Sequence, residues 1–233
     1  MYGIVYNNKH SFREFGLTML SQREMQPPAK KKITVTVPFM SGSYDFSNLY
    51  NSSHFEERTL EYRFLTKVAN VEALEAKKIA IENWLLNGNQ KTVLKDDTLK
   101  GYYYLAECTN VQVEEMHTIG KIKALFTAYP FKICEDYEGK LLWDNFNFEL
   151  DVLQETKFQV KEEKEVTLYN QGVISVTPTI ICNAPFNIEK NGTIYKVSEG
   201  TVNDCQLKFE PGMNKLIIQG EGDIEFQFRK EVL

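Results

Sequence analysis

The chain has 233 residues, of which 42% are hydrophobic and 25% are charged, and its formal net charge is −5. This length suits one large domain or two of about 100 residues, and the composition is typical of a soluble globular protein. No apolar run approaches the roughly 18 to 20 residues that span a bilayer, and the N-terminus lacks the pattern of a signal peptide. These features exclude a transmembrane-helix protein and predict synthesis in the cytoplasm, with no membrane insertion.

Charge is divided unevenly along the chain. Residues 1–133 hold 17 Lys and Arg against 14 Asp and Glu, whereas residues 134–233 hold 10 against 18. The change from net positive to net negative predicts two bodies, which we place at residues 1–135 and 136–233. An acidic second body argues against nucleic-acid binding by that half.

The first predicted strand is "KKITVTVP", in which Ile33, Val35 and Val37 alternate with polar residues until Pro38 ends the pattern. A second alternating strand follows in "TLEYRFLT", residues 59–66. The connection between them, from Pro38 to Ser53, is rich in Ser, Gly, Tyr and Asn and is long for a hairpin loop. Loops of this length are commonly functional.

One helix is predicted, from Asn70 to Gly88. Asn70 is suited to an N-cap, and Gly88 stands where a left-handed residue commonly ends a helix. A single face of this helix carries the apolar residues that we expect in the core, namely Leu74, Ile81, Trp84 and Leu85.

Strands dominate the rest of the chain. "GYYYLAECTNVQVEE" predicts two strands broken near Thr109 and Asn110, and "GKIKALFTAYPF" predicts a longer strand ended by Pro130. From about residue 137 short strands alternate with turn signals, which favours a β-sandwich. Asn191-Gly192 predicts a hairpin. The closing stretch, Pro211 to Lys230, predicts another, with a Gly-Glu-Gly-Asp turn at residues 220–223. The predicted fold class is therefore mainly β with one helix.

Motifs that carry chemistry are missing from the sequence. It contains no phosphate-binding Gly-rich loop, no nucleophile elbow and no zinc-protease motif. The four cysteines are far apart, and the three histidines, His10, His54 and His117, are scattered. We predict no catalytic, cofactor-binding or metal site and no enzyme activity. Tyr102–Tyr104 could stack on bases or sugars and Lys30–Lys32 could contact phosphate, but strand and edge roles are favoured for both.

Several stretches together resemble the distal tail protein (Dit) family of long-tailed, non-contractile bacteriophages, chiefly those that infect Gram-positive hosts. In the first half these are "FREFGLTML", "KKITVTVPFMSGSYDFS", "FEERTLEYRFL", "IENWLLNG", "KTVLKDDTLKGYYYLAE" and "ALFTAYPFK". In the second half they are "LYNQGVISVTPTIIC" and "PGMNKLIIQGEGDIEFQFRKEVL". The chain departs from the family at Phe39, where the family commonly has Gly in a Val-Pro-Gly-x-x-Gly-like turn. It also lacks a long insertion that some relatives use to hold receptor-binding proteins.

The resemblance implies a structural protein of the virion tail tip, without cofactors. Six copies would form a ring through the first domain, and the second, a galectin-like β-sandwich, would project outward. The implied partners are the major tail tube protein, the tail-tip hub or tail-associated lysin protein, the tape measure protein and a receptor-binding protein. DNA would pass through the lumen of the ring only in transit.

Within this scheme the long loop after Pro38 is the candidate contact between subunits. Its candidate residues are Pro38, Phe39, Ser41, Gly42, Tyr44, Asp45 and Tyr50. An alternative function is a carbohydrate-binding β-sandwich module that contacts the host surface, in which Trp143, Tyr169 or Tyr195 would stack on a sugar ring.

Overall fold

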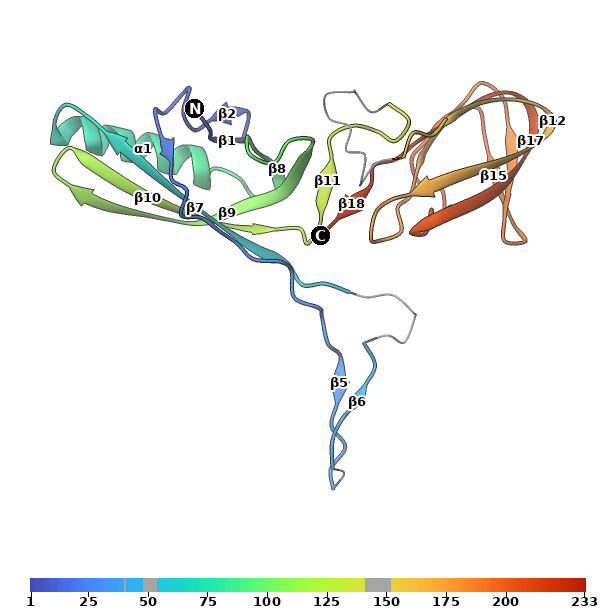
Figure 1. Ribbon diagram of the computed structural model, residues 1–233, viewed down its shortest axis with the longest axis horizontal. Coiled ribbons are helices and arrows are strands. Elements are labelled where there is room, and N and C mark those ends of the chain that lie inside the picture. The colour runs from blue at the N-terminus through green and yellow to red at the C-terminus, as the bar shows by residue number, and fades with distance from the viewer. Residues whose placement is uncertain (40, 48–53, 141–151) are drawn as a thin grey trace. The chain divides into compact units, whose positions relative to one another are not determined.

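The structure is a computed structural model, and it describes residues 1–39, 41–47, 54–140 and 152–233. The chain divides into two compact units, which are residues 1–132 with Leu233 and residues 133–232. Figure 1 shows that strands make up most of the described chain and that one helix accompanies them. The predicted fold class, mainly β with one helix, is confirmed.

The first unit is built on an antiparallel sheet. Its strands are β1 (Ile4–Tyr6), β2 (Lys9–His10), β3 (Thr18–Met19), β4 (Glu24–Met25), β7 (Arg58–Lys67), β8 (Thr92–Asp96), β9 (Tyr102–Met116) and β10 (Ile119–Ala128). Their order is β2-β1-β8-β9-β10-β7-β3, with β4 also on β7. Two further strands, β5 (Thr34–Val35) and β6 (Tyr44–Asp45), pair only with each other.

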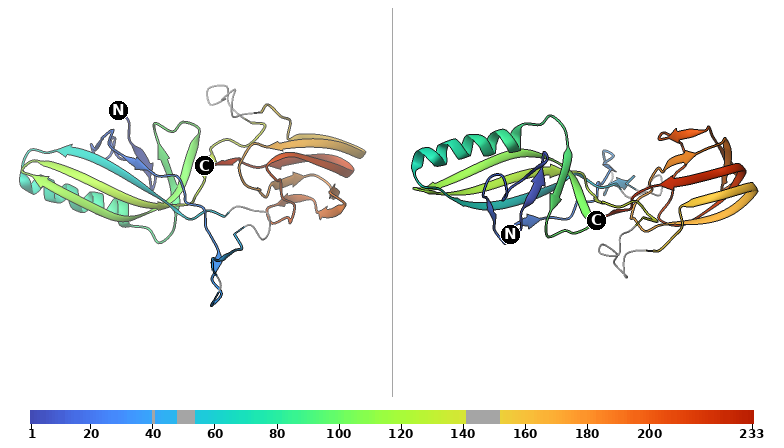
Figure 2. Two further views of the ribbon diagram at one scale, coloured as in Figure 1. Left: turned by 60° about the horizontal axis from the view of Figure 1, so that its bottom comes forward. Right: turned by 90° about the horizontal axis from the view of Figure 1, so that it is seen from above.

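Helix α1 (Val71–Leu86) covers one face of this sheet (Figure 2). Its four predicted core residues are all buried, and the side chain of Asn70 caps its first turn by accepting a bond from the Ala73 amide at 2.9 Å. The prediction for Gly88 is wrong: that residue has no left-handed backbone, and the helix ends at Leu86 with Asn87 as its C-cap, at φ −84°. Burial of one apolar face therefore fixes this helix, without a left-handed glycine at its end.

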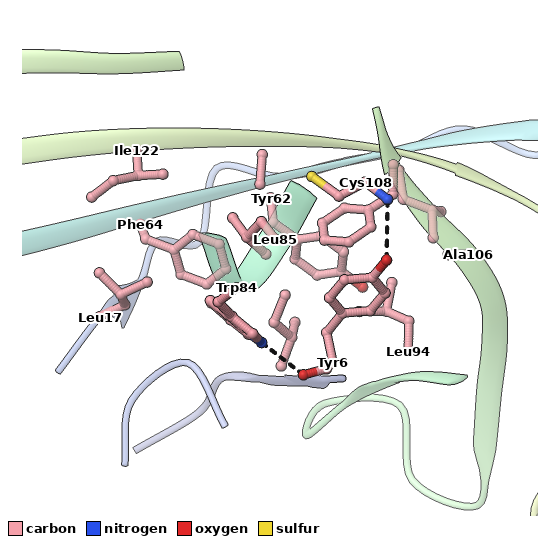
Figure 3. Close-up of a cluster of buried hydrophobic side chains, with 14 of the residues drawn as sticks. Tyr6, Leu17, Tyr62, Phe64, Trp84, Leu85, Leu94, Ala106, Cys108 and Ile122 are labelled. Atoms are coloured by element: carbon pink, nitrogen blue, oxygen red, sulfur yellow. Dashed lines mark hydrogen bonds between the residues drawn. The ribbon is translucent and has the colours of Figure 1, made fainter. Parts of the chain in front are cut away.

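Trp84 anchors α1 in the core of the first unit. Its indole Nε1 donates to the carbonyl oxygen of Tyr6 at 2.7 Å, and its ring stacks on Phe15 with centroids 4.5 Å apart. Figure 3 shows this bond, together with the one that the Cys108 amide donates to the hydroxyl of Tyr6. The helix, the first strand and the central strand are thus joined through a single buried cluster.

The break that the sequence predicts near Thr109 and Asn110 is a β-bulge within a single strand. Along β9 and β10, Leu125 pairs with Asn110 and Phe126 pairs with Cys108, so Thr109 has no partner of its own. Residues 102–116 form one strand, because a β-bulge accommodates the extra residue without ending the ladder.

The second unit contains a six-stranded sheet and a short two-stranded pairing. The sheet strands are β12 (Lys157–Asn170), β13 (Thr179–Cys182), β14 (Phe186–Lys190), β15 (Thr193–Val197), β16 (Gly200–Val202) and β17 (Gly212–Gln227), in the order β15-β14-β17-β13-β16 with β12 on β17. The short pair is β11 (Lys132–Cys134) with β18 (Glu231–Val232). Asn191 and Gly192 have φ of 52° and 79° between β14 and β15, so the predicted hairpin there is confirmed.

The predicted hairpin at the end of the chain is wrong, because residues 212–227 form one long strand. Gly220 and Gly222 have positive φ of 149° and 143°, a conformation that favours glycine, and the strand bends at these residues without reversing. The first half of β17 pairs with β14, and the second half pairs with β13. The bend folds the sheet around one hydrophobic core, and Figure 1 shows the curled outline.

Replacement of Gly220 by Ala is expected to lower the free energy of unfolding of the second unit by about 3 kcal/mol, which combines overpacking with backbone strain. A Cβ atom at this position would lie 2.5 Å from Cδ1 of Phe186. Urea denaturation monitored by circular dichroism measures the change. Gly200→Ala is the control, since Gly200 has φ 110° but open space around it, and a smaller loss is expected there. Equal losses in the two variants would contradict a role for close packing at the bend.

Candidate functional site: an exposed hairpin arm

Residues 31–39 and 41–47, which we call the arm, form a hairpin apart from the main sheet (Figure 1). Thr34 pairs with Asp45 and Val35 with Tyr44, and the amide of Phe46 donates to the carbonyl of Ile33 at 2.8 Å. All of these residues are exposed except Ser47, which is half-buried. The arm is thus a two-stranded ribbon without a covering layer.

One side of the arm is apolar, and we call it the stripe. Side chains on a strand alternate between faces, and directly paired residues share a face. The stripe therefore consists of Ile33, Val35, Val37, Tyr44 and Phe46, which are between 41% and 55% exposed. A two-stranded hairpin is marginally stable by itself in water, and large exposed apolar patches mark interaction sites. The stripe has the character of a surface that another protein covers.

The tip of the arm carries an aromatic side chain on a strained backbone. Phe39 has φ 67° and is fully exposed, and Gly42 has φ 101°. The left-handed conformation costs a residue with a Cβ atom roughly 1–2 kcal/mol, so glycine is the usual occupant. Strain of this kind clusters at functional positions.

The sequence-predicted site residues lie as follows. Pro38, Phe39, Ser41 and Gly42 form the tip of the arm, and Tyr44 and Asp45 form β6, whereas Tyr50 lies outside the described residues. The prediction missed Ile33, Val35, Val37 and Phe46 as site residues. Their alternation marked a strand, but a half-buried strand in a sheet has the same pattern.

Ser47 and Asp45 fix the base of the arm. The Ser47 amide donates to Asp45 Oδ1 at 2.9 Å, and the Ser47 hydroxyl accepts a bond from the Ile33 amide at 2.8 Å. The side-chain and backbone hydrogen bonds from Ser47 lower the pKa of Asp45 below its ordinary value. These contacts hold the two strands in register without burial.

The histidine and aspartate side chains described next form hydrogen bonds and ion pairs within the first unit. His10 is buried, with its Nε2 atom 3.0 Å from Asp97 Oδ2, and its Nδ1 atom accepts the amide of Phe12 at 3.0 Å. Asp96 pairs with Arg23 at 2.7 Å. Within the described ranges no group of three or more His, Cys, Asp or Glu residues could hold a metal ion.

The four cysteines are free thiols, and three of them are buried. Burial raises the pKa of Cys108 to about 12, so this thiol stays protonated at neutral pH. Cys205 is half-buried, and burial also raises its pKa. Protonated thiols are poor nucleophiles and poor metal ligands.

The aromatic residues considered for stacking do not form a shared platform. Tyr104 is buried in the core, and Tyr102 and Tyr103 are half-buried. Tyr169 lies on β12 and Tyr195 on β15, and Trp143 lies outside the described residues. A hollow of about 260 Å³ in the second unit is lined by Lys157, Ile181, Cys182, Asn183, Asp223, Ile224 and Glu225, none of which is aromatic.

Comparisons with known proteins show the fold. No family model matches the chain, and none of the curated proteins matches its sequence. The crystal structure of the SPP1 Dit protein (gp 19.1), described as a paradigm of the hub adsorption apparatus in phages that infect Gram-positive bacteria, matches with a TM-score of 0.65. That match covers 100% of both chains at 11% identity. The phage p2 baseplate structure in its activated conformation matches with a TM-score of 0.41 at 11% identity, over 99% of this chain and 97% of the other.

The described residues include no helix long and apolar enough to cross a membrane.

Replacement of Ser47 by Ala is expected to raise the pKa of Asp45 toward its ordinary value, because the substitution removes the hydroxyl that lowers it most. The folded-state pKa of Asp45 is depressed, so its contribution to order in the arm is present at neutral pH and is lost as the pH falls through that pKa. An NMR titration of the Asp45 carboxyl measures the shift. Ser41→Ala at the tip is the control and should leave the titration unchanged. A pKa unaffected by Ser47→Ala would show that the contact at the base of the arm does not form in solution.

Proposed function

We propose that the chain is a structural protein of a bacteriophage tail tip, in which six copies form a ring that joins the tail tube to the adsorption apparatus. The observation that carries this proposal is the fold shared with the SPP1 Dit protein over the full length of both chains. A hub needs extensive contacts with neighbours, and the exposed stripe of the arm provides a surface for one of them.

In this proposal the two units have different tasks. The first unit, together with the arm, forms the ring, while the second unit is a galectin-like sandwich that projects outward. One face of the ring stacks on the tail tube protein, and the other stacks on the tail-tip hub or tail-associated lysin protein. DNA and the tape measure protein pass through the lumen, and receptor-binding proteins attach to the assembled tip.

The edges of the main sheet support a role for the arm in ring closure. The terminal strands of that sheet, β2 and β3, have two residues each, so they offer little backbone for pairing with another subunit. Short edge strands are a common protection against such pairing. The stripe is an apolar side-chain surface on the first unit that is available for contacts between subunits.

The alternative function is a carbohydrate-binding module. A second hollow in the second unit, of about 360 Å³, has Phe186 in its lining, but this ring is only 2% exposed. The hollow lined by Lys157 and Asp223 is therefore where a sugar would be sought. Polar side chains line this hollow, but sugar sites usually add an aromatic ring that stacks on the sugar. We therefore prefer the structural role to both a sugar-binding and a catalytic one. Specific binding of the purified protein to a glycan array would reverse this preference.

The proposed ring predicts a particle of six copies in solution. Size-exclusion chromatography with light scattering gives the mass, and negative-stain microscopy of the main peak gives the symmetry. A six-fold ring with a central hole is the expected result. A protein that remains monomeric at high concentration and also with the tail tube protein of the same phage would contradict the proposal.

Replacement of Val35 by Lys is expected to weaken subunit association by at least about a hundredfold, since burying an unpaired ammonium group costs several kcal/mol. Val35 is 47% exposed, so the thermal stability of the monomer should not change. Thr36→Lys places the same charge on the opposite side of the arm and is the matched control. Light scattering over a dilution series compares the two variants. Equal weakening by both substitutions would show that the stripe is not the contact surface.

A further inference from the structure

Helix α1 carries exposed apolar side chains, which form a second such surface in addition to the stripe of the arm. Its inner face packs in the core, whereas Ala76, Ile79, Ala80, Asn83 and Leu86 are exposed, and we call these five residues the outer face. Ile79 and Leu86 are 59% and 47% exposed. A helix on the surface of a globular protein usually carries charged residues opposite its core face. Glu72 and Glu75 are exposed near the start of this side, but from Ala76 to Leu86 the exposed residues are apolar except Asn83, as on a surface that a partner covers.

We propose that the outer face of α1 in one copy receives the arm of a second copy of this chain. This inference rests on the proposed ring and assigns its contact surfaces. The arm and α1 are different surfaces of the same unit, so a contact between them is heterologous, and heterologous contacts generate closed rings when the rotation closes. Pairing of two arms with each other would cover the stripe but would leave the outer face open.

Charge favours this pairing. Lys30, Lys31 and Lys32 lie at the base of the arm, and all three are exposed. Glu72 and Glu75 lie near the start of α1 and are also exposed. Glu75 binds Lys78 of its own helix at 3.1 Å, whereas no ion pair of Glu72 occurs among the described residues. Opposite charges at one end of both surfaces set their relative direction.

The lengths of the two surfaces agree in that direction. Lys32 to Phe39 spans about 23 Å in an extended strand, at about 3.3 Å per residue. Glu72 to Leu86 spans about 21 Å along a helix, at 1.5 Å per residue. When Lys32 lies against Glu72, Phe39 therefore reaches Leu86. Ala76 and Ala80 leave room between these ends for the larger side chains of the stripe.

The aromatic side chains of the arm supply part of the area that a stable contact needs. An aromatic side chain buries about 150–250 Å² when fully covered. Phe39 is fully exposed, Tyr44 is 55% exposed and Phe46 is 41% exposed, so these three side chains alone offer several hundred Å². Each partner in a standard interface contributes about 800 Å². The stripe and the tip thus supply a large share of one side of such an interface.

Charge reversal tests the pairing in the full-length protein. Lys32→Glu and Glu72→Lys are each expected to weaken assembly about tenfold in sedimentation velocity over a dilution series. The double variant should recover to within about threefold of the unmodified protein, because the pair is restored with its signs exchanged. Lys196→Glu on β15 is the control for a change of net charge and should assemble normally.

Cross-linking tests the same contact without relying on charge. Protein carrying Val35→Cys is mixed with protein carrying Ile79→Cys and oxidised, and a disulfide-linked pair of chains is expected. Thr36→Cys mixed with Ile79→Cys is the control and should not link. The inference is overturned if rings assemble but the double variant does not recover and Val35→Cys does not link to Ile79→Cys. That result would leave the proposed ring intact. A protein that never oligomerises would overturn both.

Discussion

A two-stranded hairpin has no third layer, so it cannot cover its own apolar side. This constraint sets the arm apart from the rest of the described chain. The cores of the two units are closed by a helix on a sheet and by a sheet folded on itself. The arm exposes five apolar side chains along one face, and within the described first unit nothing covers them from water. The proposed function in assembly rests on this exposed surface more than on any polar residue.

Helix α1 also exposes apolar side chains to water. Helix α1 buries Leu74, Ile81, Trp84 and Leu85 against its own sheet. The outer face, from Ala76 to Leu86, consists of two alanines, an isoleucine, an asparagine and a leucine. Such a face does not stabilise a monomer. Each subunit of a ring, in contrast, needs two different contact surfaces, one for each neighbour. The two surfaces lie on the same unit and have matching lengths. The proposed pairing would account for the exposed apolar residues of the helix and of the arm together.

The second unit owes its shape to backbone conformation. The paired strands β12 and β17 run its full length, and the sheet bends where Gly220 and Gly222 allow β17 to change direction. A side chain at either position would collide, with Phe186 at the first and with Asn183 at the second. The bend brings two groups of strands around one core without a turn in β17.

The sequence by itself determined the local elements of this protein. The spacing of its apolar residues specified the helix with its buried face and the alternating strands, and Asn191-Gly192 specified a hairpin, because these features depend on neighbours within a few residues. Other sequence patterns fit two structures equally well, and only the tertiary structure decided between them. Alternation at Ile33, Val35 and Val37 fits a strand in a core as well as a strand in an exposed arm. Gly220 and Gly222 fit a turn as well as a bend, since glycine permits both and only the packing of Phe186 and Asn183 selects between them.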